Sequence, residues 1–426
     1  MACVSVTESR SRSAAPATGI HGGLVLLFAA SCGLAAANLY YAQPVLHTIA
    51  RHFGVTSGTA GLVVTFGQIG YALGLGLLVP VGDLLNRRRL IPGLLVVTAA
   101  ALAASAASPD IGVLIGLALL VGLGSVVVQM LVPMAASMAD DAHRGRVVGT
   151  VMSGLLLGIL LARTLSGLVA GISSWRVVYL AAATLILLMA AVLGRRLPDE
   201  GVRPHISYGE LLKTAAGLVA SEALLRRRAA YGALSFALFS IFWTTMAFLL
   251  AGPPFHYGDT VIGLFGLVGA AGALCANFAG RWADRGLTAV TTLVFALFAA
   301  VSFLPLWFGR HDLGLLILGI VVLDVGVQGL QVTNQSLIYR LRPDARSRVN
   351  SGYMVLYFAG GAIGSAVGGA VYDSHGWAGV CVAGAAVGAV ALVGAVIGML
   401  RRHSGPVHRA ATAGGAIHAS EGGSRG

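Results

Sequence analysis

The sequence predicts an all-α integral membrane protein of twelve transmembrane helices, and three observations support this fold class. Hydrophobic residues make up 57% of the 426 residues and charged residues only 10%, whereas an average soluble domain carries about 25% charged residues. Mean hydropathy is +0.85. Apolar runs of about 20 residues, long enough to cross about 30 Å of hydrocarbon as helices, recur along the whole chain. The predicted spans are residues 22–46, 60–82, 90–107, 111–137, 147–171, 175–194, 229–251, 260–280, 287–308, 313–338, 349–372 and 376–400.

The first apolar run is interpreted as a retained helix, because it is long and follows a weakly charged leader without a clear signal-peptide cleavage site. Residues 1–21 are then an N-terminal tail. The four cysteines are scattered and lack CxxC spacing, so we interpret them as small core residues and not as a metal or redox pair.

The distribution of basic residues predicts that both termini are cytoplasmic. Of the 28 Lys and Arg residues, 24 fall in the two tails and in the connections on one side of the membrane, and only Arg51, Arg176 and Arg310 fall on the other side. Basic residues concentrate in cytoplasmic loops. We therefore attribute the net charge of +12 to orientation in a lipid bilayer and expect no nucleic-acid partner.

The longest polar connection, residues 195–228, divides the chain into two six-helix bundles at 22–194 and 229–400. Residues 401–426 are expected to form a disordered cytoplasmic tail. The connection contains YGELLKTAAGLVASEALLRRR, where apolar positions beside a basic end are typical of an amphipathic helix on the inner membrane surface. A solvated linker helix fits the same pattern.

The two halves are related by an internal repeat. DDAHRGRVV at 140–148 aligns with RPDARSRVN at 342–350 at an offset of 202 residues, and the same offset pairs Gln129 with Gln331 and Trp175 with Trp377. A parallel repeat of six helices implies a pseudo-twofold axis along the membrane normal, with the substrate path between the halves.

The sequence lacks the residue patterns required for ATP hydrolysis and for a catalytic metal site. The only lysine, Lys213, has no phosphate-binding glycine loop before it, so ATP-driven transport is excluded. No HExxH motif occurs, and the histidines lie in predicted loops, tails or helix ends. We expect no enzyme activity, no metal and no cofactor.

The chain resembles the major facilitator superfamily over nearly its whole length. VPVGDLLNRRRL at 79–90 resembles the family signature between helices 2 and 3, although Leu84 and Asn86 replace the usual Arg and Gly. GRWADRG at 280–286 is a second and more faithful copy. The resemblance implies that Asp83, Arg87, Asp284 and Arg285 close the cytoplasmic side during alternating access. Topology determination by positive charge alone is the alternative.

Two further segments resemble a bacterial branch of drug and nucleoside exporters. They are NLYYAQPVL at 38–46 and RGRVVGTVMSGLLLGILLARTLSG at 144–167. The branch implies proton-coupled export from the inner membrane, most simply by a monomer. The chain departs from it by having neither an arginine in helix 4 nor a Gly-Pro pair in helix 5.

Two ionisable residues lie deep within predicted spans, Arg163 in helix 5 and Asp324 in helix 10. Such residues cost at least about 2.5 to 3.5 kcal/mol to insert and therefore pair or line a wet cavity. Each belongs to one half only, because their repeat counterparts are Ser365 and Gly122. We predict that Asp324 is the proton-coupling acid and that Arg163 binds substrate or contacts the other half. The alternatives are snorkelling of Arg163 to the interface and a structural role for Asp324.

Polar residues suggest the substrate path. Gln328, Gln331 and Gln335 share one face of helix 10. The resemblance implies that helices 1, 4, 7 and 10 line the cavity, which would turn this stripe and Gln129 toward substrate. Interhelical hydrogen bonding is the alternative.

Helix 1 contributes a second polar group, suited to stacking on a flat molecule and bonding to its edge. Its members are Asn38, Tyr40, Tyr41 and Gln43. An aromatic belt at the outer interface is the competing interpretation. Weaker candidates are Gln68, Tyr71, Phe239, Trp243 and Tyr357.

The prediction is a secondary active transporter that exports a small organic solute in exchange for protons by alternating access. An uncoupled facilitator or importer is the first alternative. A membrane sensor that binds a ligand without moving it is the second.

Overall fold

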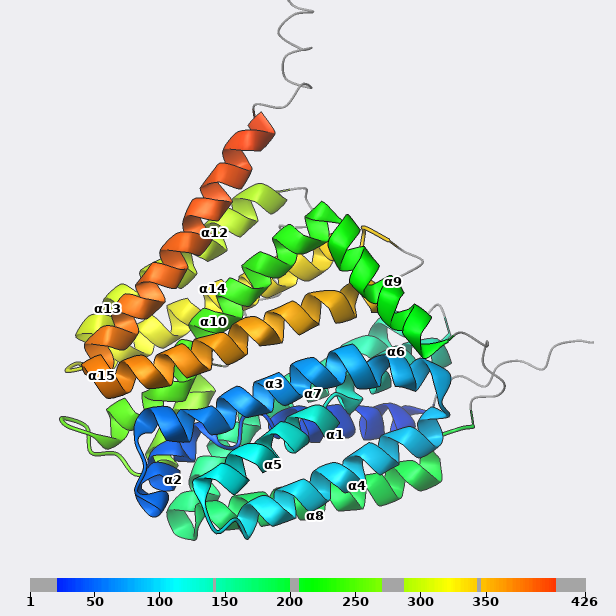
Figure 1. Cartoon of the computed structure of the whole chain (residues 1–426), viewed down its shortest axis with the longest axis horizontal. Helices are drawn as coiled ribbons and strands as arrows, with labels where there is room; N and C mark the ends of the chain where they lie inside the picture. The colour runs from blue at the N-terminus through cyan, green and yellow to red at the C-terminus, as the bar shows by residue number, and fades with distance from the viewer. Residues whose placement is uncertain (1–20, 141–142, 200–206, 270–286, 343–345, 404–426) are drawn as a thin grey trace, which may run out of the picture.

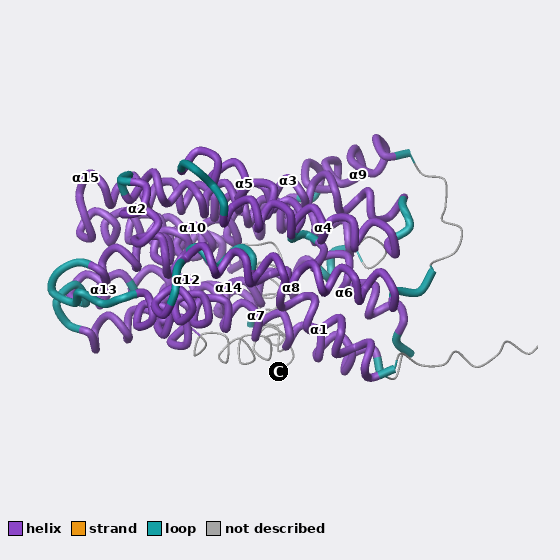
Figure 2. The backbone as a smooth tube through the Cα atoms, turned by 90° about the horizontal axis from the view of Figure 1, so that it is seen from below, coloured by secondary structure: helices purple, strands orange, loops and turns teal. Residues whose placement is uncertain are grey.

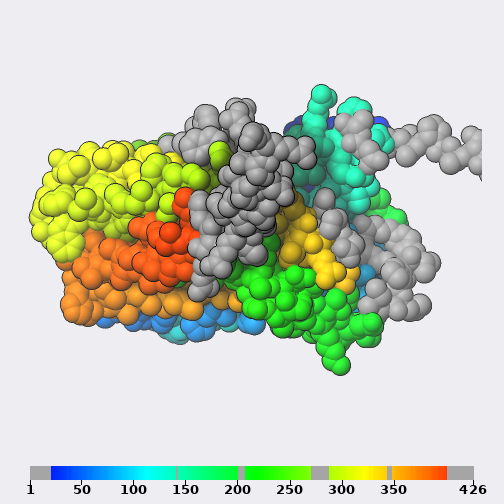
Figure 3. Space-filling model, turned by 90° about the horizontal axis from the view of Figure 1, so that it is seen from above, coloured from blue at the N-terminus to red at the C-terminus, as the bar shows by residue number. Residues whose placement is uncertain are grey.

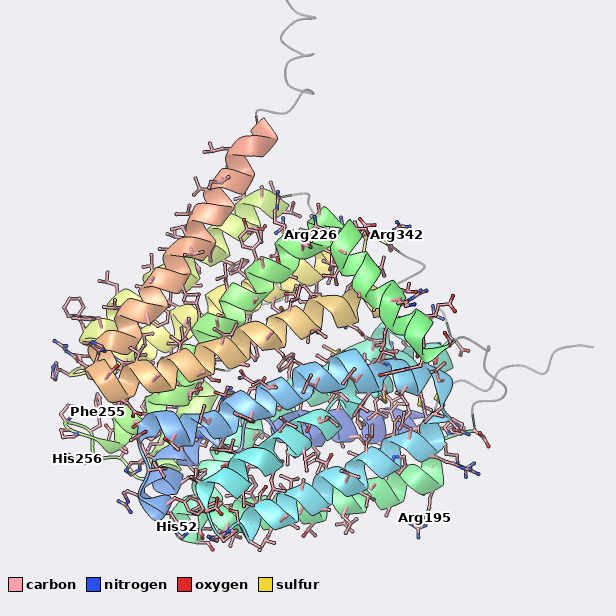
Figure 4. The ribbon with its side chains drawn as sticks, viewed as in Figure 1. His52, Arg195, Arg226, Phe255, His256 and Arg342 are labelled. Carbon is pink, nitrogen blue, oxygen red and sulfur yellow. The ribbon has the colours of Figure 1, made fainter. Side chains whose placement is uncertain are left out.

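The computed structural model describes residues 21–140, 143–199, 207–269, 287–342 and 346–403. Its helices run side by side along the long axis of the molecule (Figure 1), and the described ranges contain no strand (Figure 2). Loops predicted on one side, such as those with His52 and His256, lie at one end, and Arg195 and Arg342 lie toward the other (Figure 4). Antiparallel membrane spans require this arrangement. The predicted all-α membrane fold class is confirmed.

Among its described residues, the N-terminal half has eight α-helices and one short 3₁₀ helix. They are α1 (Gly22–Ala37), η1 (Gln43–Val45), α2 (Leu46–Phe53), α3 (Ser57–Leu84), α4 (Arg87–Ala106), α5 (Ile111–Gly124), α6 (Val127–Met138), α7 (Arg144–Ile172) and α8 (Trp175–Arg196).

The connection and the C-terminal half follow. They contain α9 (Tyr208–Ser221), α10 (Ala223–Ala251), the helix Asp259–Gly269, α12 (Thr288–Val301), α13 (Phe303–Phe308), α14 (Leu313–Ile338) and α15 (Arg346–His403). Helix α9 crosses one end of the bundle, where it packs on α3 and α15. Seen from above, α15 and the α9–α10 region form much of the visible face of the C-terminal half (Figure 3).

Nine helices of the described residues are long and apolar enough to cross a membrane. The last of them, Arg348–Leu400, covers two predicted spans, because the backbone only changes direction at Gly376 (φ 60°, ψ −156°). Predicted span 1 corresponds to the shorter apolar helix Gly22–Ala37, and the described part of predicted span 8 is the helix Asp259–Gly269. Residues 270–280 of span 8 lie outside the described residues. The count of twelve stays a prediction.

One predicted helix boundary was wrong. Span 1 stops at Ala37 and not at residue 46, because Pro44, which lacks an N–H donor, lies in the 3₁₀ helix Gln43–Val45. Predicted spans 4 and 9 agree with the apolar spans Ile111–Met138 and Thr288–Phe308. Each has an internal break. The first is at Ser125, whose hydroxyl donates to the carbonyl of Val121 at 2.7 Å and so competes with the helix ladder. The second is at Ser302, just before Pro305.

The two halves meet through small residues. Gly167 of α7 packs against the backbone of Gly263, where an added Cβ would lie 2.6 Å from the partner Cα. On the other side of the molecule, Thr65 of α3 and Ser365 of α15 share a buried hydrogen bond of 2.7 Å. Close backbone approach at the first site and a hydrogen bond between small hydroxyl side chains at the second hold the halves together.

Several expectations lie outside the described residues. They are the structure of residues 1–20 and 404–426, and the gate residues Asp284 and Arg285.

Candidate functional site

Arg163 lies in the middle of α7, and its side chain is only 4% exposed. Its Nε donates to Oε1 of Gln43 at 2.7 Å. The guanidinium carbon lies 4.6 Å from the ring centre of Tyr40, 4.2 Å from that of Trp243 and 5.3 Å from that of Phe239. We call these four partners the arginine cage. Since the side chain is enclosed within the protein, it does not snorkel to the membrane interface.

The cage draws residues from both halves. Tyr40 and Gln43 come from the break after α1, and Phe239 and Trp243 lie one turn apart on α10. Ser166, one turn after Arg163, donates to the main-chain carbonyl of Tyr41 at 2.6 Å and fixes the break against α7. The Pro44 break therefore lets helix 1 turn a tyrosine and an amide toward the arginine.

The cage is also electrostatically favourable for the arginine. Aromatic faces carry negative charge density, and a desolvated cation on such a face gains about 2 kcal/mol or more. The carbonyl oxygen of Gln43 adds a charge-assisted hydrogen bond. These contacts offset part of the cost of burying a guanidinium without a direct carboxylate partner.

Asp324 lies on α14, and its side chain is also only 4% exposed. The indole Nε1 of Trp243 donates to its Oδ1 at 3.3 Å. A Cβ at Gly269 would lie 2.5 Å from Oδ2, so only glycine leaves room for the carboxylate there. The carboxylate thus sits against α10 and the helix Asp259–Gly269.

Arg163 and Asp324 do not form a direct ion pair. The ion pairs between described residues are Arg87–Asp83 and Arg342–Glu222. Trp243 instead contacts both groups, with its face toward the arginine and its N–H toward the carboxylate. Arg163 therefore reaches the C-terminal half through the rings of Phe239 and Trp243.

Some buried polar atoms at this site have no hydrogen-bond partner among the described residues. They are the donors Nη2 of Arg163 and Nε2 of Gln43. An unmet buried group costs about 1–3 kcal/mol. An acceptor oxygen that reached these two donors would therefore be bound favourably.

The remaining helix 1 candidates, Asn38 and Tyr41, are buried but are not part of the arginine cage. Nδ2 of Asn38 donates to the hydroxyl of Ser125 at 3.2 Å, which ties helix 1 to the break in span 4. Tyr41 is buried, and its ring lines an apolar groove on the outside of the N-terminal half.

The glutamine stripe lies away from the cage. Gln331 is seven residues beyond Asp324, or about 10 Å along α14. Its Oε1 accepts from the hydroxyl of Tyr353 at 2.5 Å, and its Nε2 approaches the sulfur of Met354 at 3.7 Å. Gln328 and Gln335 are half-buried.

Gln129 bridges the halves at a similar level. Its Nε2 donates to the hydroxyl of Tyr71 at 3.3 Å, and its Oε1 accepts from Nδ2 of Asn350 at 3.4 Å. Gln129 and Gln331 thus act in this conformation as interhelical hydrogen-bonding residues, which was the alternative considered from the sequence.

In the described part of the gate, Arg87 at the start of α4 bonds to the end of α3. Its Nη2 donates to Oδ1 of Asp83 at 2.9 Å, and its Nε donates to the carbonyl of Gly82 at 3.1 Å.

Sequence reasoning missed a set of contacts at the outer end, which we call the outer latch. The hydroxyl of Thr48 lies 2.7 Å from both carboxylate oxygens of Asp259. The main-chain N–H of Gly58, at the start of α3, donates to Oδ2 of Asp373 at 2.9 Å. Both acids belong to the C-terminal half and both donors to the N-terminal half, so the latch holds the outer ends of the halves together.

Arg228 was also missed as a buried residue. The sequence places it in the basic end of the connection, but its side chain is only 2% exposed at the start of α10. It donates to the hydroxyl of Thr292 at 2.8 Å and to Oδ1 of Asn334 at 3.5 Å. It therefore joins α10 to α12 and α14, and a hydropathy pattern gives no signal for such a contact.

The relatives of this chain are transporters. The uncharacterized transporter YgaY of Escherichia coli O157:H7 is 50% identical over 370 residues, which cover 87% of this chain and 94% of that protein. The protein named "Probable transporter SCO4007" of Streptomyces coelicolor is 36% identical over 362 residues, which cover 84% of each chain.

Solved structures share the fold at low sequence identity. The nucleoside transporter NupG gives a TM-score of 0.72 at 14% identity, covering 88% of this chain and 99% of its own. A bacterial homolog of the human lysosomal transporter Spinster, in an inward-facing and occupied conformation, gives 0.68 at 13% identity, covering 90% and 96%. The sequence model of the family described as Major Facilitator Superfamily matches residues 26–308 and 255–421 of this chain. The chain therefore belongs to the major facilitator superfamily and is a membrane transporter of that type.

Proposed function

We propose that this transporter exports a small organic solute in exchange for protons. The observation that carries the proposal is the buried arrangement of Arg163, Trp243 and Asp324, in which one indole contacts a cation of the N-terminal half and a carboxylate of the C-terminal half. A proton taken up or lost by Asp324 would change the charge at the point where the halves meet. Alternating access needs such a link between charge and the relative position of the halves.

The cage favours a particular kind of substrate. Its aromatic faces suit a flat ring, while the fixed positive charge of Arg163 disfavours a cation. The free donors on Arg163 and Gln43 suit a carbonyl or carboxylate oxygen. A flat solute with an acceptor oxygen at its edge meets both requirements.

Proton exchange follows if substrate and proton use the same site in turn. A substrate group that donates a hydrogen bond to the ionised carboxylate of Asp324 favours loss of its proton. Protonation of Asp324 removes that acceptor and favours release of the substrate. Trp243 transmits the effect to Arg163 because it touches both side chains.

The same proposal includes location and orientation. The 24 basic residues on one side of the predicted membrane support an inner-membrane transporter with both termini in the cytoplasm. One chain contains both halves of the cage, which supports a monomer as the working unit.

Flux in sealed vesicles tests the proposal. The full-length protein is reconstituted into liposomes, and uptake of candidate flat carboxylates is measured with and without an imposed pH gradient. Substrate movement against its own gradient, driven by protons, is expected. Equal flux with and without the gradient would show an uncoupled facilitator, and saturable binding without flux would show a sensor.

A further inference from the structure

An apolar groove runs along the outside of the N-terminal half between α1, α7 and α8, which pack against one another. It has a volume of about 720 Å³. Its walls include leucines that are more than half exposed, namely Leu26, Leu157 and Leu165. Along α7 it extends from Thr150 to Val169, or about 28 Å of helix rise. This is close to the thickness of the hydrocarbon layer, about 30 Å.

Small residues create the groove. Its floor includes Ala30 and Gly33 of α1 and Gly154 and Gly158 of α7. A Cβ on Gly33 would lie 2.6 Å from the carbonyl oxygen of Gly154, so the two backbones are already in contact. Glycine and alanine at these positions have no side chain long enough to fill the groove over the contact between α1 and α7. The groove can therefore be filled by an apolar lipid chain from the membrane.

A second pocket continues the groove at the end where α7 begins. Its volume is about 380 Å³, and it shares Leu26 and Thr150 with the groove. Three charged or titratable side chains line it: Asp140, His143 and Arg146. All three are exposed, so a headgroup can reach them from the aqueous interface. The pocket therefore offers both signs of charge next to an apolar channel.

We propose that the groove and the pocket together bind one aminophospholipid. The phosphate lies beside Arg146 and His143, the ammonium lies beside Asp140, and an acyl chain lies along the groove toward Leu157. A basic residue near the membrane surface contributes about 1 kcal/mol to attraction of an anionic lipid group. The carboxylate of Asp140 opposes a purely anionic headgroup and favours one that also carries an ammonium.

The site has a consequence for transport because α7 also carries Arg163. A bound lipid contacts α7 on its outer face, opposite to the cage, and fills the space between α1 and α8. It would thus support the position of the helix on which the substrate site is built.

Lipid retention tests the proposal with the full-length protein purified in mild detergent. Native mass spectrometry and lipid extraction are expected to show one phosphatidylethanolamine per chain. Arg146→Gln should retain at least fivefold less, and Ala30→Trp should do the same by filling the groove. Arg195→Gln, which removes an exposed arginine at the end of α8 outside both pockets, is the matched control and should retain the wild-type amount. Wild-type retention by both Arg146→Gln and Ala30→Trp would overturn the site.

A second measurement tests the headgroup. Wild-type protein in phosphatidylglycerol nanodiscs is titrated with short-chain phosphatidylethanolamine and followed by the same mass analysis. Saturable one-to-one binding is expected, and Asp140→Asn should weaken it relative to phosphatidylglycerol. Binding that never saturates, or retention of phosphatidylglycerol alone, would overturn the assignment of an aminophospholipid.

Discussion

The indole N–H of Trp243 on α10 donates to the carboxylate of Asp324 on α14 at 3.3 Å, and the face of the same indole lies 4.2 Å from the guanidinium of Arg163 on α7. One side chain thus contacts a cation and an anion that do not contact each other. The cation belongs to the N-terminal half and the anion to the C-terminal half, so Trp243 links charged groups of both halves.

Replacing Asp324 by Asn should abolish transport driven by a proton gradient but preserve exchange of substrate for substrate. The amide fills the same space and still accepts from Trp243, but it takes up no proton. Gradient-driven flux is expected to disappear while substrate counterflow persists, both measured in proteoliposomes. Asp312→Asn on the same helix is the control, because Asp312 caps α14 through Leu315 and Asn caps equally well. Gradient-driven flux that survives in Asp324→Asn would remove this residue as the coupling acid.

Replacing Arg163 should weaken substrate binding without preventing folding. Gln loses the charge, and Lys keeps it but lacks the planar group that lies against the rings of the cage. Loss of a hydrogen bond to a charged group is worth about 1.5–3 kcal/mol, so we expect about a tenfold or larger rise in substrate Kd for both variants. Binding is measured by calorimetry on monodisperse protein. An unchanged Kd in Arg163→Gln would assign the arginine to packing alone.

Trp243→Phe should affect pH dependence more than affinity. The phenyl ring keeps an aromatic face for Arg163 but has no N–H for Asp324. The pH profile of flux is expected to shift, while the substrate Kd changes by less than about threefold. Trp377→Phe is a matched control, since its N–H donates to the carbonyl of Leu306 inside the C-terminal half. Similar pH profiles for wild type and Trp243→Phe would show that the indole does not link the two charges.

Weakening the outer latch should open the outer end more often. Thr48→Val removes the hydroxyl donor to Asp259, and Asp373→Asn weakens the bond to the N–H of Gly58. The measurement is labelling of Thr65→Cys, a buried position between the halves, by a membrane-impermeant maleimide in a cysteine-free background. Labelling is expected to be several times faster in the latch variants. Asp110→Asn, which keeps the cap of α5 within the N-terminal half, should label at the wild-type rate. Equal rates for all variants would argue against the latch.

Hydropathy and charge predicted the positions of the helices well. Each helix that crosses the hydrocarbon layer must itself be apolar over its length, so each one is visible in its own stretch of sequence. Burial of Arg163 and Asp324 also follows from their depth in apolar runs. The partner of each charge does not. Trp243 is one of several aromatic residues on α10, beside Phe236, Phe239 and Phe242, and a uniformly apolar helix gives no reason to choose it.

Contacts between the halves were the least predictable part. In the sequence, Asp259 and Asp373 look like ordinary acidic residues of connecting loops. Their hydrogen bonds in the outer latch depend on how the two bundles pack against each other. The break in helix 1 shows the same limit at a smaller scale: Pro44 signals a turn, but whether Gln43 then faces Arg163 depends on the rotation of α7. Local patterns determine where an element stops, and docking of elements determines which side chains meet.

The contact between Gly167 and Gly263 lies one turn from Arg163 on α7. At this contact the two helix backbones touch without intervening side chains. One helix can therefore rotate against the other without any side chain changing its rotamer. If the halves rotate about this contact, Arg163 lies close to the axis, and a small rotation would displace it much less than the ends of the helices.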